Sequence, residues 1–263
     1  MEKERVVTVK KLGIVIPIYN TAQYLRQCVD SVLNQSYKNI SVALVDDGST
    51  DGSGKICDEY ARVDSRVSVI HQDNQGMIKA RYAGAKVLDC DYITTVDSDD
   101  WIAEETYSEL AQYMEREIDV ITFLLLSYFP DKHIQTGINI FKHKEYSKKE
   151  IESVILPNMI WVCESSTFGL DPSLCNKLFK KSYFMKAITE ALPLNVDYGQ
   201  DMAILYPLMK EINTLRITGG KYYYHRQREK GVIPSYILDS DFDVKTKRLT
   251  EYLKKVFDYR DDY

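Results

Sequence analysis

The chain has 263 residues, of which 44% are hydrophobic and 28% are charged, a balance that suits a globular protein of one large domain or two closely packed lobes. The net charge of -5 excludes a basic footprint, so we expect no nucleic-acid partner, although a local basic pocket or a metal ion could still hold an anionic small molecule. Five scattered cysteines without a CxxC pair argue against a disulfide framework or a zinc site. The charged start MEKERVVTVKK has no signal-peptide core, so we expect a cytoplasmic protein.

Apolar runs and amphipathic segments alternate through the first half of the chain. We expect buried strands at residues 13–19, 41–45, 67–70, 92–96 and 120–128. Between them, apolar residues recur at helical spacing, which predicts helices at 21–35, around 56–60, at 76–88 and at 104–116. Strands that alternate with helices of this length favour an α/β fold, with a mostly parallel, doubly wound sheet flanked by helices.

The pattern is more mixed after residue 128. Residues 133–141 favour a strand or hairpin, and a capping box from Ser147 to Glu150 predicts a helix that ends near residue 156. Further along we expect, in order, a helix at 199–210, β-prone runs on both sides of 219–220, and a last helix within 239–263.

We therefore divide the chain into three parts that no linker separates. Residues 1–128 form a nucleotide-binding type of half, residues 129–232 a mixed half of the same domain, and residues 233–263 a helical tail. One face of the tail helix is apolar. The sequence leaves open whether that face packs on the core, on another subunit or on a membrane surface.

Polar residues directly follow each of the first four predicted strands. These turns are PIYN, DDGSTD, HQDNQG and DSDDW, in chain order. Ligands of open α/β sheets bind beyond the carboxyl ends of the strands. Four polar turns in this order therefore predict one binding site along that edge of the sheet.

The acids of DSDDW carry the clearest chemical signal. Asp97 and Asp99 lie two residues apart, so in an extended chain their carboxylates point the same way and can share a hard cation such as Mg²⁺ or Mn²⁺. The alternative is a solvated acidic loop before the next helix, and we assign Asp100 to the start of that helix. With a cation on Asp97 and Asp99, these acids need no basic partner from the protein.

The DDGSTDGS turn has two interpretations. Asp, Gly and Ser form turns and helix caps, so the segment can be purely structural. Two acids that close an apolar strand can also accept hydrogen bonds from a base or a ribose. The chain contains no GxGxxG and no GxxxxGK[ST], so neither a dinucleotide site nor a P-loop is indicated.

Taken together, PIYNTAQYLRQCVDSVLNQSYKN, LVDDGSTDGS, DNQGMIKARYAGA and YITTVDSDDW resemble, in order and spacing, the family-2 glycosyltransferases of the GT-A fold. The resemblance is strong over about residues 11–115. It continues more loosely through LCNKLFKKSYF (174–184), YGQDMAILYPLM (198–209) and YYYHRQ (222–227), which are similar to bacterial members that build capsular, cell-wall or protein-linked glycans. The fold implied is a Rossmann-like, mostly parallel sheet followed by a mixed, acceptor-side half.

The resemblance implies a donor site for a UDP-sugar. Pro17 and Tyr19 would line the nucleotide pocket, and Asp47 would pair with the uracil. Asn74 and Arg81 would support the base and the phosphate side.

The resemblance also implies a reaction centre. Asp97 would lie toward the ribose, and Asp99 would bind the Mn²⁺ or Mg²⁺ ion that bridges the diphosphate. Asp201 would be the catalytic base of an inverting displacement, although an acid at a helix start can equally be a cap. Relatives commonly carry Glu where this chain has Gln200, and that departure puts the acceptor type and the rate in question.

Two further positions are weaker candidates. Lys177 would face the diphosphate, although most lysines of this kind are solvated. His225 would reach the metal or the diphosphate, although a surface-strand histidine is an equally good description.

The main hypothesis is an inverting, metal-dependent transferase that moves a sugar from a UDP-sugar to a hydroxyl of a glycan, a glycopeptide or a lipid-linked acceptor. One alternative is a sugar-nucleotide-binding subunit with little activity, which Gln200 favours and the intact acids oppose. A nucleotidyltransferase would need a glycine- and lysine-rich loop near the N-terminus, and a haloacid-dehalogenase-like phosphatase would need its Asp-x-Asp after the first strand, where this chain has PIYN. A homo-oligomer and a contact with the inner face of the membrane stay open.

Overall fold

A computed structural model describes residues 9–137, 140–160, 167–196, 198–227 and 240–258. Within these ranges the strands form one sheet in the order β3-β2-β1-β4-β9-β6-β10-β5, with β7 beside β6 and β8 beside β10. The strands are β1 (Leu12–Ile18), β2 (Ile40–Asp47), β3 (Val67–Gln72), β4 (Tyr92–Thr95), β5 (Trp101–Ile102), β6 (Val120–Tyr128), β7 (Ile134–Thr136), β8 (Glu145–Ser147), β9 (Lys177–Lys180) and β10 (Thr214–Arg226). Strands β1 to β4 pair in parallel, and β10 is parallel to β6. The predicted α/β fold with a mostly parallel sheet is confirmed.

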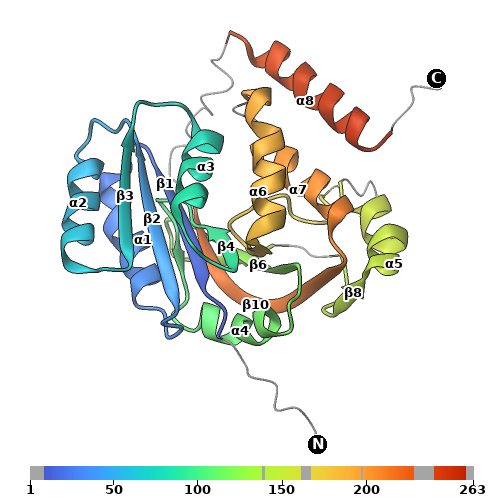
Figure 1. The fold of residues 1–263 in the computed structure, drawn as a ribbon, viewed down its shortest axis with the longest axis horizontal. Helices are drawn as coiled ribbons and strands as arrows, with labels where there is room; N and C mark the ends of the chain where they lie inside the picture. The colour runs from blue at the N-terminus through green and yellow to red at the C-terminus, as the bar shows by residue number, and fades with distance from the viewer. Residues whose placement is uncertain (1–8, 138–139, 161–166, 197, 228–239, 259–263) are drawn as a thin grey trace, which may run out of the picture.

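Helices cover both faces of this sheet (Figure 1). The longer helices are α1 (Ala22–Leu33), α2 (Ser53–Val63), α3 (Met77–Val87), α4 (Thr106–Glu115), α6 (Lys181–Ala191), α7 (Gln200–Glu211) and α8 (Phe242–Val256). Along β1, Ile14 and Ile16 pack in a core with α1, α2 and α4, whereas Val15 packs in a second core with α3, α6 and α7. Because alternate side chains of β1 are buried on opposite faces, its sequence is apolar throughout.

Helix α3 lies unusually close to the sheet at Gly84. A Cβ atom at this position would be 2.5 Å from Val15 Cγ1 and 3.0 Å from Val45 Cγ2. The glycine that interrupts the predicted helix at 76–88 therefore serves packing, because a larger side chain would push α3 away from β1 and β2. This close approach also brings the preceding turn of α3, which carries Arg81, near the strand ends.

The second half of the chain adds strands to the same sheet. β9 is antiparallel to both β4 and β6, and β5 is antiparallel to β10. The β-prone runs around 219–220 form one strand, β10, whose register against β6 shifts between Ile217 and Tyr223. The hydrophobic periodicity did not predict the short strands β5, β8 and β9 or the helix α6.

The predicted capping box is present, because Ser147 and Glu150 exchange side-chain-to-backbone hydrogen bonds. The helix it opens changes character twice: α5 (Lys148–Glu150) is followed by the π-helical η1 (Ile151–Ile155) and the 3₁₀ turn η2 (Leu156–Asn158). A second 3₁₀ turn, η3 (Leu192–Leu194), follows α6. Of the strand or hairpin predicted at 133–141, the structure shows the strand β7, which pairs with β6 in antiparallel orientation; residues 138–139 lie outside the described ranges.

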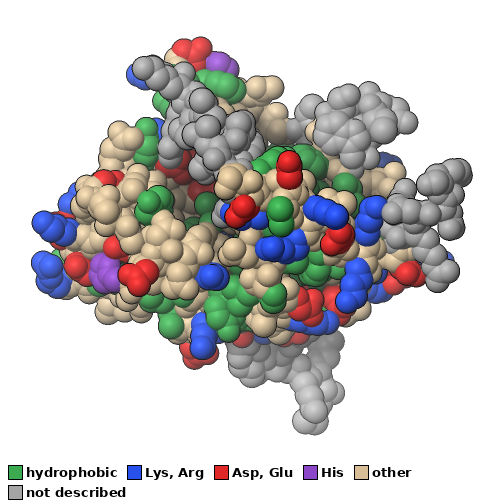
Figure 2. Space-filling model, turned by 90° about the horizontal axis from the view of Figure 1, so that it is seen from above, with side chains coloured by type: hydrophobic (Ala, Val, Ile, Leu, Met, Phe, Trp, Pro, Cys, Tyr) green, Lys and Arg blue, Asp and Glu red, His purple; other side chains and the backbone are tan. Residues whose placement is uncertain are grey.

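Helix α8 lies beside α6 and α7 at the top of Figure 1. Its Leu249 is buried and packs in the same core as α6 and α7, and Tyr252, Leu253 and Phe257 lie against that core. The apolar face of the tail helix thus packs on the protein's own core. Figure 2 looks onto this side of the molecule, where basic and acidic side chains are interspersed with apolar ones. A span of the bilayer would need a longer, more apolar helix than any found in the described ranges.

Candidate functional site

The turns after β1, β2, β3 and β4 meet at one pocket with a volume of about 530 Å³. Its walls include, from these four turns and from α7, the residues Pro17, Tyr19, Asp47, Asn74, Gly76, Asp97, Asp99 and Gln200. The four polar turns thus meet along one edge of the sheet, as predicted, and that they bind a ligand there stays a prediction. The volume lies within the range of about 300–1,000 Å³ that is typical of small-molecule sites.

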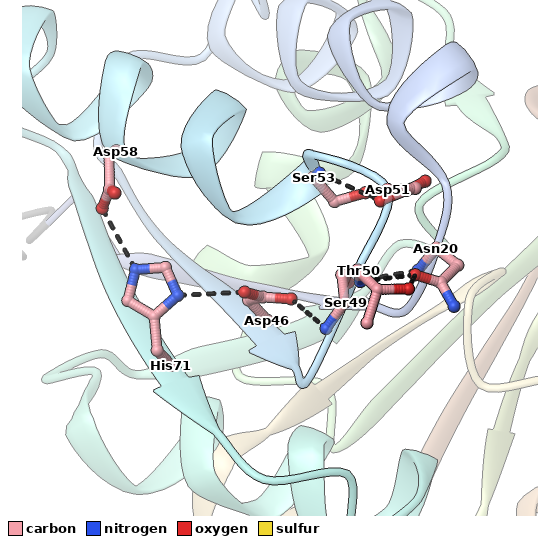
Figure 3. A network of polar contacts seen from close by, with 8 residues as sticks. All are labelled: Asn20, Asp46, Ser49, Thr50, Asp51, Ser53, Asp58 and His71. Atoms are coloured by element: carbon pink, nitrogen blue, oxygen red, sulfur yellow. Dashed lines mark hydrogen bonds and ion pairs between the residues drawn. The ribbon is translucent and has the colours of Figure 1, made fainter.

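A network of hydrogen bonds joins the first two turns (Figure 3). Asp46 Oδ1 accepts from the backbone N–H of Ser49 at 3.0 Å. Asn20, with a left-handed φ of 52°, donates its backbone N–H to Ser49 Oγ at 3.1 Å and accepts from the backbone N–H of Thr50 at 2.8 Å. The turn after β2 is therefore shaped by its own polar side chains together with Asn20 of the first turn, in line with the structural interpretation of DDGSTDGS.

His71 extends this network to α2. Its Nδ1 lies 3.0 Å from Asp46 Oδ2, and its Nε2 lies 3.1 Å from Asp58 Oδ1 (Figure 3). Hydrogen bonds to Asp46 and Asp58 raise the pKa of His71. The ring ties the end of β2 to α2 behind the turn.

Asp47 holds the third turn against the second. Its side chain is buried, and Oδ1 accepts from Gln72 Nε2 at 2.6 Å and from the backbone N–H of Gln75 at 2.9 Å. Oδ2 accepts from the backbone N–H of Gly76 at 2.9 Å, where a φ of 88° favours glycine. A carboxylate offers about four acceptor positions, so these three contacts leave capacity for one donor from a ligand in the pocket.

Asp100 does not lie at the start of a helix, and that expectation is wrong. Helix α4 begins at Thr106, and Asp100 is 1% exposed. Its Oδ2 accepts from the Tyr223 hydroxyl at 2.8 Å, and its Oδ1 accepts from the backbone N–H of Arg226 at 2.8 Å. The Tyr223 oxygen also accepts from the backbone N–H of Asp97 at 3.0 Å. Asp100 thus anchors the acidic turn to β10.

Arg226 also fixes the acidic turn, through its side chain. Its Nε donates to the Asp99 backbone carbonyl at 2.8 Å, and one terminal nitrogen donates to Gln27 Oε1 at 2.6 Å. The guanidinium carbon lies 4.8 Å from the ring centre of Tyr24 and 4.6 Å from that of Trp101. Contacts with two aromatic rings hold the planar group in one orientation.

Arg81 joins Asp97 to Asp201 inside the protein. Its side chain is 1% exposed; one terminal nitrogen donates to Asp201 Oδ1 at 2.5 Å and the other to Asp97 Oδ1 at 3.0 Å. Burial by itself lowers the pKa of Arg81, but the charges of Asp201 and Asp97 outweigh this and raise it. Arg81 does not line the pocket, and the acids do have a basic partner in the protein, contrary to expectation.

Asp201 lies in the first turn of α7 but does not cap it. Gly199 occupies the cap position, with a φ of 72°. The Asp201 carboxylate instead accepts from Arg81 at Oδ1 and from the backbone N–H of Leu174 at Oδ2, 3.1 Å away. The fold thereby lets a single guanidinium, that of Arg81, bind both Asp201 and Asp97, although 104 positions separate the two acids in the chain.

Residues 13–179 match the family described as "Glycosyl transferase family 2". The chain belongs to this family. The chain is 35% identical over 175 residues to the glycosyltransferase GlyA of Streptococcus pneumoniae, which is 66% of this chain and 25% of GlyA. It is 47% identical over 112 residues to the glycosyltransferase GlyG of the same organism, which is 42% of this chain and 37% of GlyG. The aligned region of this family-2 glycosyltransferase thus spans only a quarter to two fifths of these relatives.

Among solved structures, S. aureus TarS residues 1–349 in complex with UDP superimposes with a TM-score of 0.64 at 20% identity, over 95% of this chain and 72% of that one. The complex of the same TarS fragment with UDP-GlcNAc gives a TM-score of 0.61. At this level of identity the likeness shows the GT-A fold.

Burial and mutual repulsion disfavour the ionised form of two carboxylates in the acidic turn of this family-2 protein. Burial, together with the charges of Asp201 and Asp99, raises the pKa of Asp97 even though Arg81 opposes the shift. Burial and the charges of Asp97 and Asp99 raise the pKa of Asp100 to about 8. A cation would relieve this repulsion, and carboxylate oxygens suit Mg²⁺ or Mn²⁺, so Asp97 and Asp99 fit a divalent ion.

His225 does not join these acids. It is exposed at the end of β10, where its Nδ1 lies 2.9 Å from Gln227 Nε2. Within the described ranges, no group of three or more His, Cys, Asp or Glu side chains is placed to hold a metal ion. His225 is therefore not placed to be a third metal ligand beside Asp97 and Asp99, because its side chain is exposed to solvent at the end of β10.

The prediction that Lys177 faces the diphosphate is wrong. Lys177 is fully buried at the start of β9. Its ammonium donates to the carbonyls of Asp171 and Ser173 and to the side-chain oxygen of Asn176. Strand β9 lies between β4 and β6, so the side chain is enclosed by the sheet and the segment before it.

Sequence reasoning missed the residues that support the site from a distance. Tyr223, Arg226 and Leu174 lie in the segments YYYHRQ and LCNKLFKKSYF, but their roles could not be predicted, because they depend on the register of β10 and on the path of the segment before β9. Gly76 had a signal in DNQG, where a glycine stands directly before a helix.

Proposed function

We propose that this chain is an inverting glycosyltransferase that uses Mn²⁺ or Mg²⁺ and transfers a sugar from a UDP-sugar to a hydroxyl of a glycan, glycopeptide or lipid-linked acceptor. The observation that carries the proposal is the shared pocket of Pro17, Tyr19, Asp47, Asn74, Asp97 and Asp99, with Asp201 linked to it through Arg81. The whole protein's substrates belong to the same proposal.

The donor is assigned to the pocket by its chemistry. Tyr19 and Pro17 offer apolar surface to a base, and Asp47 retains an acceptor position for the imide N–H of uracil. Asp97 and Asp99 would hold the metal ion, which neutralises the charge that develops on the leaving diphosphate. The UDP and UDP-GlcNAc complexes of TarS support this choice of donor.

The transfer is a single displacement at the anomeric carbon. The acceptor oxygen forms a bond to that carbon from one face while the bond to the diphosphate oxygen breaks on the other, so the configuration inverts and UDP leaves with the electron pair. The acceptor hydroxyl gives its proton to Asp201, a contribution worth about 10²–10⁴-fold in rate. Arg81 orients Asp201 through the hydrogen bond to Oδ1, and Gln200 on the pocket wall contacts the acceptor sugar.

A screen of nucleotide sugars tests the proposal. The ligands are UDP, UDP-glucose, UDP-galactose, UDP-GlcNAc, UDP-GalNAc and dTDP-sugars, with melting temperature and hydrolysis as readouts. We expect UDP to raise the melting temperature only with Mn²⁺ or Mg²⁺, and Asp99→Ala to abolish that rise. Metal-independent binding of UDP would contradict the role of Asp97 and Asp99.

Asp201→Asn separates binding from chemistry. The substitution keeps the side-chain shape, so we expect UDP-sugar binding to persist while turnover is lost. Near-normal turnover would remove Asp201 as the base. Binding of a UDP-sugar by the unsubstituted chain with no turnover on any acceptor would favour the binding-subunit alternative.

A further inference from the structure

Lys177 is a buried charge that the proposed reaction does not use. It is 0% exposed, and all three ammonium donors have partners: the Asp171 carbonyl at 2.7 Å, the Ser173 carbonyl at 2.6 Å and Asn176 Oδ1 at 2.7 Å. An ammonium ion is costly to bury unless it is fully hydrogen-bonded. Its partners all lie within the six residues before it, so the segment 171–176 is folded around the ammonium.

The segment 171–176 is also fixed to the sheet. Asn176 donates from Nδ2 to the Phe123 carbonyl at 3.0 Å, and the backbone N–H of Phe123 donates to the Asn176 carbonyl at 3.1 Å. The backbone N–H of Lys177 donates to the Leu174 carbonyl at 3.2 Å. The ammonium therefore holds the segment in one shape, while β6 holds it in one place.

One N–H of this segment points to Asp201. The backbone N–H of Leu174 donates to Asp201 Oδ2 at 3.1 Å, while Arg81 binds Oδ1. Each carboxylate oxygen thus has one partner from a different part of the chain. Without the Leu174 contact, Asp201 would be held from one side only, and its carboxylate could rotate.

We propose that Lys177 is a positioning residue for Asp201, which acts by folding the segment 171–176 so that the Leu174 N–H holds the carboxylate. This inference rests on the proposed role of Asp201 as the base. It concerns the acceptor's proton and not the donor, because the described contacts of Lys177 include no residue that lines the pocket.

The test compares Lys177→Met with Thr94→Val. Methionine matches the length of lysine without its charge. Thr94 is buried, and its hydroxyl donates to the Lys177 carbonyl at 2.7 Å, so Thr94→Val disturbs the same residue from the other side and leaves the ammonium contacts intact. The readouts are kcat, KM for the UDP-sugar, melting temperature, and amide hydrogen exchange at Leu174.

We expect Lys177→Met to lower kcat by about 10–100-fold, because small misplacements of a catalytic group can cost this much, with KM for the donor unchanged. Exchange at Leu174 should accelerate. Thr94→Val should lower the melting temperature without a comparable loss of kcat. Unchanged kcat in folded Lys177→Met, a parallel rise of KM, or an equal loss in Thr94→Val would each overturn the inference.

Two provisions keep the test decisive. If Lys177→Met does not fold, Asn176→Asp takes its place, because it keeps an oxygen for the ammonium and removes the Nδ2 donor to the Phe123 carbonyl. We then expect kcat and Leu174 exchange to stay near those of the unsubstituted chain, and a large loss of kcat would show that the tie to β6, and not the ammonium, positions the segment. If the unsubstituted chain transfers no sugar, the proposed function fails. Amide hydrogen exchange at Leu174 still tests the positioning role in that case. An exchange rate that is the same in the variant and in the unsubstituted chain would show that Lys177 does not hold the segment 171–176.

Discussion

Substituting Arg81 by methionine would leave two carboxylates without their shared cation. Arg81 is almost completely buried, and it is the group that binds both Asp97 and Asp201. Methionine fills much of the same space, so the chief change is electrostatic. We therefore expect Arg81→Met to destabilise the fold through charge and to a lesser degree through packing.

The burial of the partners sets the size of the effect. Removing one member of a buried ion pair costs about 3–5 kcal/mol, because the remaining charge is left uncompensated. The side chains of Asp97 and Asp201 are 29% and 28% exposed, which places the loss at the lower end, about 3 kcal/mol. For a domain of this size that corresponds to a fall in melting temperature of roughly 6–12 °C.

The assay is thermal and urea unfolding of Arg81→Met and of the triple variant Arg81→Met/Asp97→Asn/Asp201→Asn. The triple variant carries no uncompensated acid at these positions, so it should be more stable than the single one. The deficit of Arg81→Met should also shrink as the pH falls, because protonation neutralises both carboxylates. A loss below about 1 kcal/mol, the level of a surface ion pair, or a triple variant no more stable than Arg81→Met, would refute the reasoning.

Three further predictions concern stability, each measured as a melting temperature. Because Asp46 and Asp58 raise the folded-state pKa of His71, the stabilisation it provides is full below its unfolded pKa of about 6.5 and is lost as the pH rises through the folded value. The difference in melting temperature between the unsubstituted chain and His71→Gln should therefore shrink as the pH rises through the folded-state pKa. A difference that stays constant with pH would contradict this. Gly84→Ala should destabilise, because overpacking against β1 costs about 1–3 kcal/mol and outweighs a gain of up to about 1 kcal/mol in helix propensity. Leu249→Ala should cost about 2–5 kcal/mol if α8 packs on α7 as described, and no change would show that α8 is not part of the cooperative core.

Local patterns were sufficient for the parallel strands in the first half of the chain. The apolar runs and their polar turns predict the parallel strands, and parallel strands must end at the same edge, so the meeting of PIYN, DDGSTD, HQDNQG and DSDDW follows from periodicity alone. The family resemblance rests on the same four turns. The division at residues 128 and 232, the location in the cytoplasm and the individual roles of the site residues stay predictions.

The three acids of DSDDW show where sequence reasoning ended. Spacing along an extended chain predicts that Asp97 and Asp99 point the same way. Residues 97–100 instead form a turn, in which the backbone N–H of Asp100 donates to the Asp97 carbonyl at 3.0 Å. That Asp100 is buried under β10 depends on a strand more than 100 residues later, and no local pattern encodes that register.

The sequence by itself determined the class of fold, the edge of the sheet where the pocket lies and the pair of acids that suits a divalent ion, because each follows from the period of a strand or the chemistry of a side chain. The tertiary structure alone decided which charges meet. Arg81, predicted to support the phosphate side, binds Asp97 and Asp201, and Lys177 turns inward to its own loop. A buried charge must find a partner wherever the chain brings one, and that partner is set by long-range packing.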